Sequence, residues 1–158
     1  MPLEPELKAR LLQQLGAILP PEALLTAKED LHPYECDGLT AYRRLPVAVV
    51  LPTCTEQVQS TAKVCAALRI PVVARGAGTG LSGGVLPHED GIILSLARMN
   101  RILDIDLRNL QARVQPGVRN LAISQAVDQY GLFYAPDPSS QIACAIGGNV
   151  AENSGGVH

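Results

Sequence analysis

Nine of the fourteen glycines in this 158-residue chain fall in two short windows. Five lie between Gly76 and Gly84, and four lie between Gly147 and Gly156. Glycine has no Cβ, so its backbone can take positive φ and approach a ligand closely. Successive bare N–H groups in such turns form concave sites for anions, above all phosphate. One window would be explained by ordinary tight turns. Two windows, each interleaved with Thr, Ser or Asn, predict two strips of backbone that close on one phosphate-bearing ligand.

Two apolar runs predict a parallel sheet beside the first window. Residues 47–51 and 71–75 read as strands with two apolar faces, which is typical of strands buried in a parallel sheet. Between them, Thr53 and Glu56 have the spacing of a capping box, which predicts a helix from residue 54 to about residue 68. This βαβ unit places the first window at the carboxyl end of its second strand, the edge where open α/β sheets bind ligands.

The remaining periodicity predicts further elements of an α/β chain. An apolar stripe predicts an amphipathic helix over residues 4–17. Residues 91–96 predict another strand, and residues 102–106 and 111–115 predict a strand pair. A helix that starts near Leu121 is expected to end at Tyr130, with Gly131 as its left-handed cap. One further helical turn is expected around residues 150–153.

The first window literally matches the dinucleotide fingerprint G-x-G-x-x-G at residues 78–83. That fingerprint needs its last glycine to open a helix, and Gly83, Gly84 and Pro87 block one. A loop-only phosphate cradle remains, with amides of residues 76–80 as donors. The hydroxyls of Thr79 and Ser82 either add to these donors or bond within the turn. Arg75 is expected either beside the phosphate or, more commonly for such an arginine, paired with a carboxylate.

Composition excludes several classes of function. The net charge of −2 and an aromatic content of 3% argue against a nucleic-acid partner, which requires basic stripes or stacking platforms. The longest apolar runs are far shorter than the roughly 20 residues that span a bilayer, and the first ten residues do not resemble a secretory signal. The four cysteines lack metal-ligand spacing, so no metal site is expected. We therefore expect a cytoplasmic protein that contacts a membrane only through partners.

Three motifs together resemble the FAD-linked oxidases of the vanillyl-alcohol oxidase/PCMH type. These are residues 71–84, 136–140 and 146–156, which occur in the family's order. Within this family the chain resembles the D-2-hydroxy-acid dehydrogenase branch, and most of all the FAD-binding subunits of bacterial glycolate oxidases. The likeness covers essentially the whole chain.

The resemblance implies an α/β (α+β) fold with two small subdomains, a βαβ unit first and a mixed sheet second, with FAD between them. Residues 1–44 would be an N-terminal helix and irregular lead-in. Residues 45–158 would be the N-terminal portion of a PCMH-type FAD-binding domain, which is truncated and therefore incomplete.

The resemblance also implies a cofactor site. The first window would wrap the FAD pyrophosphate, the segment 136–140 would follow the ribityl–isoalloxazine side, and the second window would close the other side. Covalently flavinylated members usually carry His in or near these loops, and the first window has none, so FAD is expected to be non-covalent. The expected cofactor-binding residues are Gly76, Ala77, Gly78, Thr79, Gly80, Ser82, Gly84, Pro136, Asp137, Ser140, Gly147, Gly148, Asn149 and Ser154.

The implied reaction of the intact protein is oxidation of a small 2-hydroxy acid, glycolate to glyoxylate, with hydride transfer to flavin N5. Electrons would pass to an iron–sulfur partner subunit, with a sister flavin-domain subunit alongside, peripherally at the inner membrane. The catalytic base is expected beyond residue 158, so this part alone is expected to be inactive. Asp137 is interpreted as a turn-capping residue rather than an acid/base. Oxidation of D-lactate or 2-hydroxyglutarate, and a non-catalytic flavin-binding or assembly module, remain alternatives.

Overall fold

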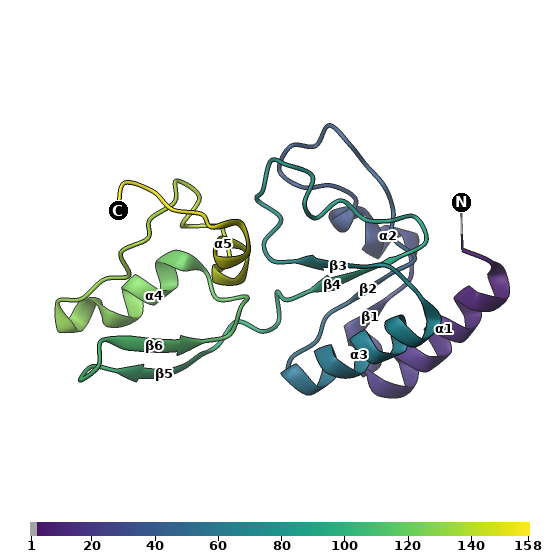
Figure 1. Ribbon diagram of the computed structural model, residues 1–158, viewed down its shortest axis with the longest axis horizontal. Helices are drawn as coiled ribbons and strands as arrows, with labels where there is room; N and C mark the ends of the chain where they lie inside the picture. The colour runs from purple at the N-terminus through teal and green to yellow at the C-terminus, as the bar shows by residue number, and fades with distance from the viewer. Residues whose placement is uncertain (1–2) are drawn as a thin grey trace.

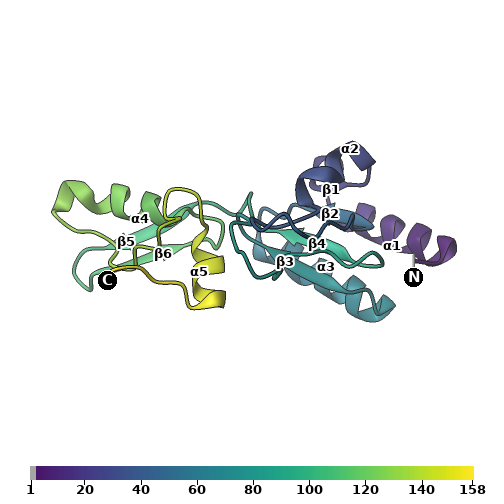
Figure 2. The ribbon, with the colours of Figure 1, turned by 90° about the horizontal axis from the view of Figure 1, so that it is seen from above.

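The computed structural model describes residues 3–158, which form two lobes joined between β4 and β5 (Figures 1 and 2). The first lobe contains a four-stranded sheet of strand order β1-β2-β4-β3. Its strands are β1 (Leu24–Leu25), β2 (Ala48–Val50), β3 (Val72–Arg75) and β4 (Ile92–Ser95). The strands β2, β4 and β3 are parallel, and β1 pairs antiparallel with β2. The helices of this lobe are α1 (Pro5–Ile18), η1 (Pro21–Ala23), α2 (Lys28–Leu31), η2 (His32–Tyr34) and α3 (Thr55–Leu68).

The core of the first lobe confirms the predicted βαβ unit and amphipathic N-terminal helix. Helices α1 and α3 pack against each other, and Leu11 and Leu15 of α1 are fully buried against the sheet. Every residue of β2 and β4 is buried, as expected for strands with two apolar faces. The sheet thus holds the carboxyl end of β3 toward the second lobe (Figure 1).

The prediction that residues 71–75 form a buried strand is wrong. Strand β3 lies at the edge of the sheet, its exposure alternates along the strand, and Val72 is 39% exposed. The reason is topological, because the later strand β4 inserts between β2 and β3. An edge strand pairs on one side only, so the loop that follows it is free to turn toward the second lobe.

The predicted capping box at the start of α3 is also wrong by one residue. Cys54, with φ −148° and ψ 164°, is the N-cap, and no side chain caps the helix there. Oε1 of Gln57 instead accepts hydrogen bonds from the Thr53 amide at 2.7 Å and from its hydroxyl at 3.2 Å. Because the cap falls at residue 54, the side chain in the third helical position is Gln57, and Glu56 cannot fill that role.

The second lobe contains an antiparallel hairpin and two helices. Strands β5 (Ile102–Asp106) and β6 (Gln111–Val114) are the whole second sheet within residues 3–158. Helix α4 (Asn120–Val127) runs into η3 (Asp128–Tyr130) and ends at Gly131, which has φ +69° and so confirms the predicted left-handed cap. The last helix is α5 (Ile146–Glu152). No helix in the described part of the chain is long and apolar enough to cross a bilayer.

All four cysteines are free thiols, and their burial predicts different reactivity. Cys65 is 1% exposed in the core, and burial raises the pKa of its thiol to about 11. The thiolate is the form that attacks a disulfide reagent, and at about pH 8 roughly one Cys65 in a thousand is ionised. We expect Ellman's reagent to modify the half-buried Cys36 and Cys54 in the native chain, and Cys65 only after unfolding. The Cys65→Ala variant should lower the number of reactive thiols only in the denatured chain. A lower number of reactive thiols in the native chain would contradict the burial of Cys65.

Candidate functional site

The first glycine loop begins where β3 ends. Residues 76–84 form neither helix nor strand, which confirms a loop without a following helix. Gly78 has φ +73° and Gly83 has φ +75°, a conformation that L side chains rarely adopt. A methyl group at Gly78 would also overlap the guanidinium of Arg75.

Arg75 holds the base of this loop in a different way from the one expected. Its Nη1 donates to the carbonyl oxygen of Cys36 at 2.6 Å, and its guanidinium carbon lies 5.6 Å from the centre of the Tyr34 ring. Burial lowers the pKa of the guanidinium. The predicted carboxylate pairing is therefore wrong, because a backbone carbonyl and an aromatic face take the place of the carboxylate.

Helix α5 occupies the first part of the second glycine window, and residues 153–156 follow it without regular structure. The prediction placed a single helical turn at residues 150–153, but the helix starts four residues earlier. The amide of Ile146 donates to the Val118 carbonyl, and the amide of Gly147 donates to the Pro116 carbonyl, both at 2.8 Å. A methyl group at Gly147 would lie 2.8 Å from Cβ of Pro116, so glycine at this position lets α5 dock closely.

The two windows meet across a cavity of about 260 Å³. A methyl group at Gly76 would lie 3.4 Å from Cβ of Ala145 and 3.8 Å from the amide nitrogen of Gly148, so the walls are within van der Waals reach. Nine of the expected cofactor-binding residues line this cavity: Gly76, Ala77, Gly78, Thr79, Gly80, Ser140, Gly148, Asn149 and Ser154. The structure thus brings together two segments that lie about 70 residues apart.

The other five expected residues do not line this cavity. Ser82 and Gly84 belong to the distal part of the first loop. Gly147 packs against Pro116, and the carbonyl of Pro136 accepts a hydrogen bond from Nδ2 of Asn120 at 3.0 Å.

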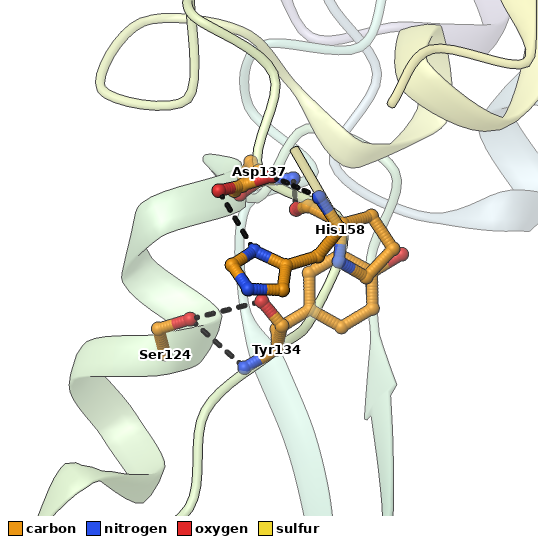
Figure 3. A network of polar contacts seen from close by, with 6 residues as sticks. Ser124, Tyr134, Asp137 and His158 are labelled. Atoms are coloured by element: carbon orange, nitrogen blue, oxygen red, sulfur yellow. Dashed lines mark hydrogen bonds and ion pairs between the residues drawn. The ribbon is translucent and has the colours of Figure 1, made fainter. Parts of the chain in front are cut away.

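The fifth, Asp137, faces the end of the chain (Figure 3). Its Oδ1 accepts from the backbone amide of His158, and its Oδ2 lies 3.1 Å from the Nδ1 of the same residue. The hydrogen bond from the His158 amide, followed by the contact with the His158 imidazole, lowers the pKa of the Asp137 carboxyl. Nearby, the Ser124 hydroxyl accepts from the Tyr134 amide at 2.9 Å (Figure 3). The Asp137 carboxylate therefore bonds to His158, 21 residues later in the chain, where a bond within its own turn was expected.

Sequence reasoning missed five residues of the lining, namely Leu81, Val85, Cys144, Ala145 and Glu152. Two of these directly precede the second window, and a slightly wider window would have included them. Glu152 lies four residues after Gly148 on α5, on the same face of the helix, so the helical spacing would have identified it. A second cavity of about 450 Å³, not foreseen, shares Gly76, Ala77 and Ala145 with the first and carries Arg119 in its lining.

The donors around the 260 Å³ cavity are neutral, and this decides what they can hold. No Lys or Arg lines it among the described residues; its donors are backbone amides, three hydroxyls and the Asn149 amide, and the Glu152 carboxylate also lies in the lining. Asn149 is 8% exposed, and its Nδ2 is buried without a hydrogen-bond partner in the described chain. A buried donor without a partner costs about 1–3 kcal/mol, so an acceptor atom of water or of a ligand at this nitrogen would be favourable. Phosphate or carbonyl oxygens of a dinucleotide satisfy both requirements, and the residues present therefore fit FAD.

Residues 46–158 match a family model described as an FAD binding domain. Over 151 residues the chain is 60% identical to the glycolate oxidase subunit GlcD of Escherichia coli (strain K12), covering 96% of this chain and 30% of that protein. It is 37% identical over 138 residues to a D-lactate dehydrogenase of Anaerostipes hadrus, covering 87% of this chain and 29% of that protein.

A solved structure gives the same result. The structure of p-cresol methylhydroxylase with substrate bound superposes with a TM-score of 0.73 at 26% identity, covering 85% of this chain and 28% of that one. The chain spans about 30% of the length of each of these relatives.

Proposed function

Because the chain belongs to the family of FAD binding domains, we propose that it is the flavin-holding N-terminal portion of a 2-hydroxy-acid dehydrogenase. The family expected from the sequence motifs is confirmed, as is the PCMH-type α/β fold. The observation that carries the proposal is the cavity between the two glycine windows, where a buried Asn149 donor has no partner within the described chain.

The proposed roles follow from the positions of the donors. The loop 76–80 would hold the FAD diphosphate with its amides and the Thr79 hydroxyl. Ser140, Asn149 and Ser154 would bond from the opposite wall. The remaining expected residues, Ser82, Gly84, Pro136, Asp137 and Gly147, would support these two walls. No histidine lines the cavity, which supports a non-covalent site. Residues 45–158 would then be one portion of a longer flavin domain, preceded by the lead-in 1–44.

The chain's own residues would bind and orient the cofactor rather than carry the chemistry. FAD, when bound, supplies a hydride acceptor for the α-carbon of a hydroxy acid. The ionisable side chains that line the cavity are Cys144, which is 3% exposed, and Glu152 at the end of α5. Both line the cavity that is proposed to hold FAD. We therefore propose that the base lies in a part of the protein outside this chain.

Glycolate is the proposed substrate because the relative that is 60% identical is a glycolate oxidase subunit. D-lactate is the second candidate, supported by the D-lactate dehydrogenase that is 37% identical. The word "subunit" in the first name also supports a multi-subunit enzyme. We propose an iron–sulfur subunit and a sister flavin subunit as its other members.

A chimera tests the function. This chain would replace the corresponding 151 residues of the Escherichia coli subunit GlcD. We expect the chimera to bind FAD and to lose its visible flavin absorbance when glycolate is added without oxygen, more readily than with D-lactate. A faster response to D-lactate would favour the second candidate. A yellow chimera that responds to no hydroxy acid, beside an active unaltered GlcD, would contradict an enzymatic role and favour a binding module.

A further inference from the structure

The segment before β2 closes on the first glycine loop. The amide of Gly38 donates to the carbonyl of Gly80 at 3.0 Å, while Arg75 donates to the carbonyl of Cys36. A methyl group at Gly38 would lie 3.0 Å from the Thr79 carbonyl oxygen and 3.1 Å from that of Gly80. Residues 36–38 therefore lie in direct backbone contact with the loop, although about 40 residues separate them in sequence.

One carboxylate in this segment, that of Asp37, accepts hydrogen bonds both from its own turn and from the first glycine loop. Asp37 is 8% exposed. Its Oδ2 accepts from the Gly83 amide at 2.7 Å, and its Oδ1 accepts from the Leu39 amide at 3.0 Å. Hydrogen bonds from amides to an ionised acceptor are shorter and roughly twice as strong as neutral ones. Asp37 thus fixes its own turn with one oxygen and the far end of the glycine loop with the other.

A glycine loop without such support would be poorly ordered. Residues 76–84 have no helix or strand to hold them, and fixing each residue's backbone costs about 1–2 kcal/mol. A loop that is ordered before its ligand arrives binds more tightly, because part of that cost is already met in the free protein. We propose that Asp37 is a positioning residue of the flavin site, which orders the amides of the first glycine loop for the FAD diphosphate. This inference rests on the proposed function, because it assigns that site a supporting carboxylate outside both windows.

The test compares Asp37→Ala and Asp37→Asn with a matched control, Asp106→Ala. Asp106 is also a turn carboxylate, whose Oδ1 accepts from the Arg108 and Asn109 amides at 3.0 Å, but it lies in the β5–β6 turn. Two measurements are made on the purified chain. Amide hydrogen exchange without FAD reports the order of residues 76–84, and quenching of flavin fluorescence reports the FAD dissociation constant.

We expect Asp37→Ala to speed exchange in residues 76–84 and to raise the FAD dissociation constant about tenfold. Asp37→Asn, which retains one acceptor oxygen, should fall between Ala and the unaltered chain, and Asp106→Ala should leave both readouts unchanged. Faster exchange with unchanged FAD affinity would overturn the positioning role. Unchanged exchange would show that the Asp37 carboxylate does not order residues 76–84. If the unaltered chain binds no FAD, the proposed function fails, while the exchange measurement still decides whether Asp37 orders residues 76–84.

Discussion

Replacing Gly117 by alanine is expected to destabilise the chain by about 3 kcal/mol, the upper end of the usual penalty for overpacking. The added methyl group would overlap the carbonyl oxygen of Leu96 and lie 2.8 Å from that of Met99. Both obstacles are backbone atoms, which cannot move aside as a flexible side chain can. The Gly117 amide also donates to the Met99 carbonyl at 2.8 Å, so relief of the clash would break this bond.

The same turn supports the candidate site. The carbonyls of Pro116 and Val118 accept the amides at the start of α5, so displacement of Gly117 would also displace that helix. Urea denaturation gives the measurement. Gly16→Ala is the matched control, because nothing lies within 4 Å of its methyl group, and it should stabilise helix α1 by about 0.5–1 kcal/mol. An unfolding midpoint for Gly117→Ala equal to that of the unaltered chain would contradict the described packing.

Replacing Gly148 by valine is expected to weaken FAD binding about a hundredfold. Gly148 lines the cavity between the windows, and nothing lies within 4 Å of a methyl group added there. In the free chain the Cβ of the new side chain would therefore meet no neighbouring atom. In the complex it would compete with the ligand for the space that the two windows enclose.

The effects of Gly148 variants on folding and on binding should have opposite signs. Gly148 lies within α5, and a glycine in a helix is less stable than alanine by about 0.5–1 kcal/mol. Gly148→Ala should therefore unfold at higher urea and yet bind FAD more weakly, whereas Gly16→Ala should gain stability and keep its affinity. Equal FAD affinity in the unaltered chain and in Gly148→Val would show that the ligand does not occupy this cavity.

The first lobe was largely predictable because its elements follow from local patterns. The apolar runs at residues 47–51 and 91–96 contain the buried strands β2 and β4, and the stripe in α1 buries Leu11 and Leu15. The exposure of β3 was not predictable, because it depends on a strand that occurs later in the chain and pairs between β2 and β3. Local propensity carries no information about strand order.

The two glycine windows that form the walls of the candidate site could be predicted from the sequence. The contacts that hold these walls in place could not. Glycine enrichment identified both windows, and the structure brings them together. The sequence predicted only one helical turn, at residues 150–153, whereas α5 starts at Ile146 and Gly147 lets this helix dock closely on Pro116. The contact between Asp37 and Gly83 depends on how the lead-in folds back, and no periodic pattern records it.

A titration of the purified chain with FAD, followed by denaturation, tests the proposed flavin site most directly. We expect saturation at one FAD per chain, with full release of the flavin into the supernatant when the protein is precipitated by acid. A chain that binds no flavin would contradict the central claim that the two glycine windows form one FAD site. Flavin that stays with the precipitate would contradict the non-covalent link.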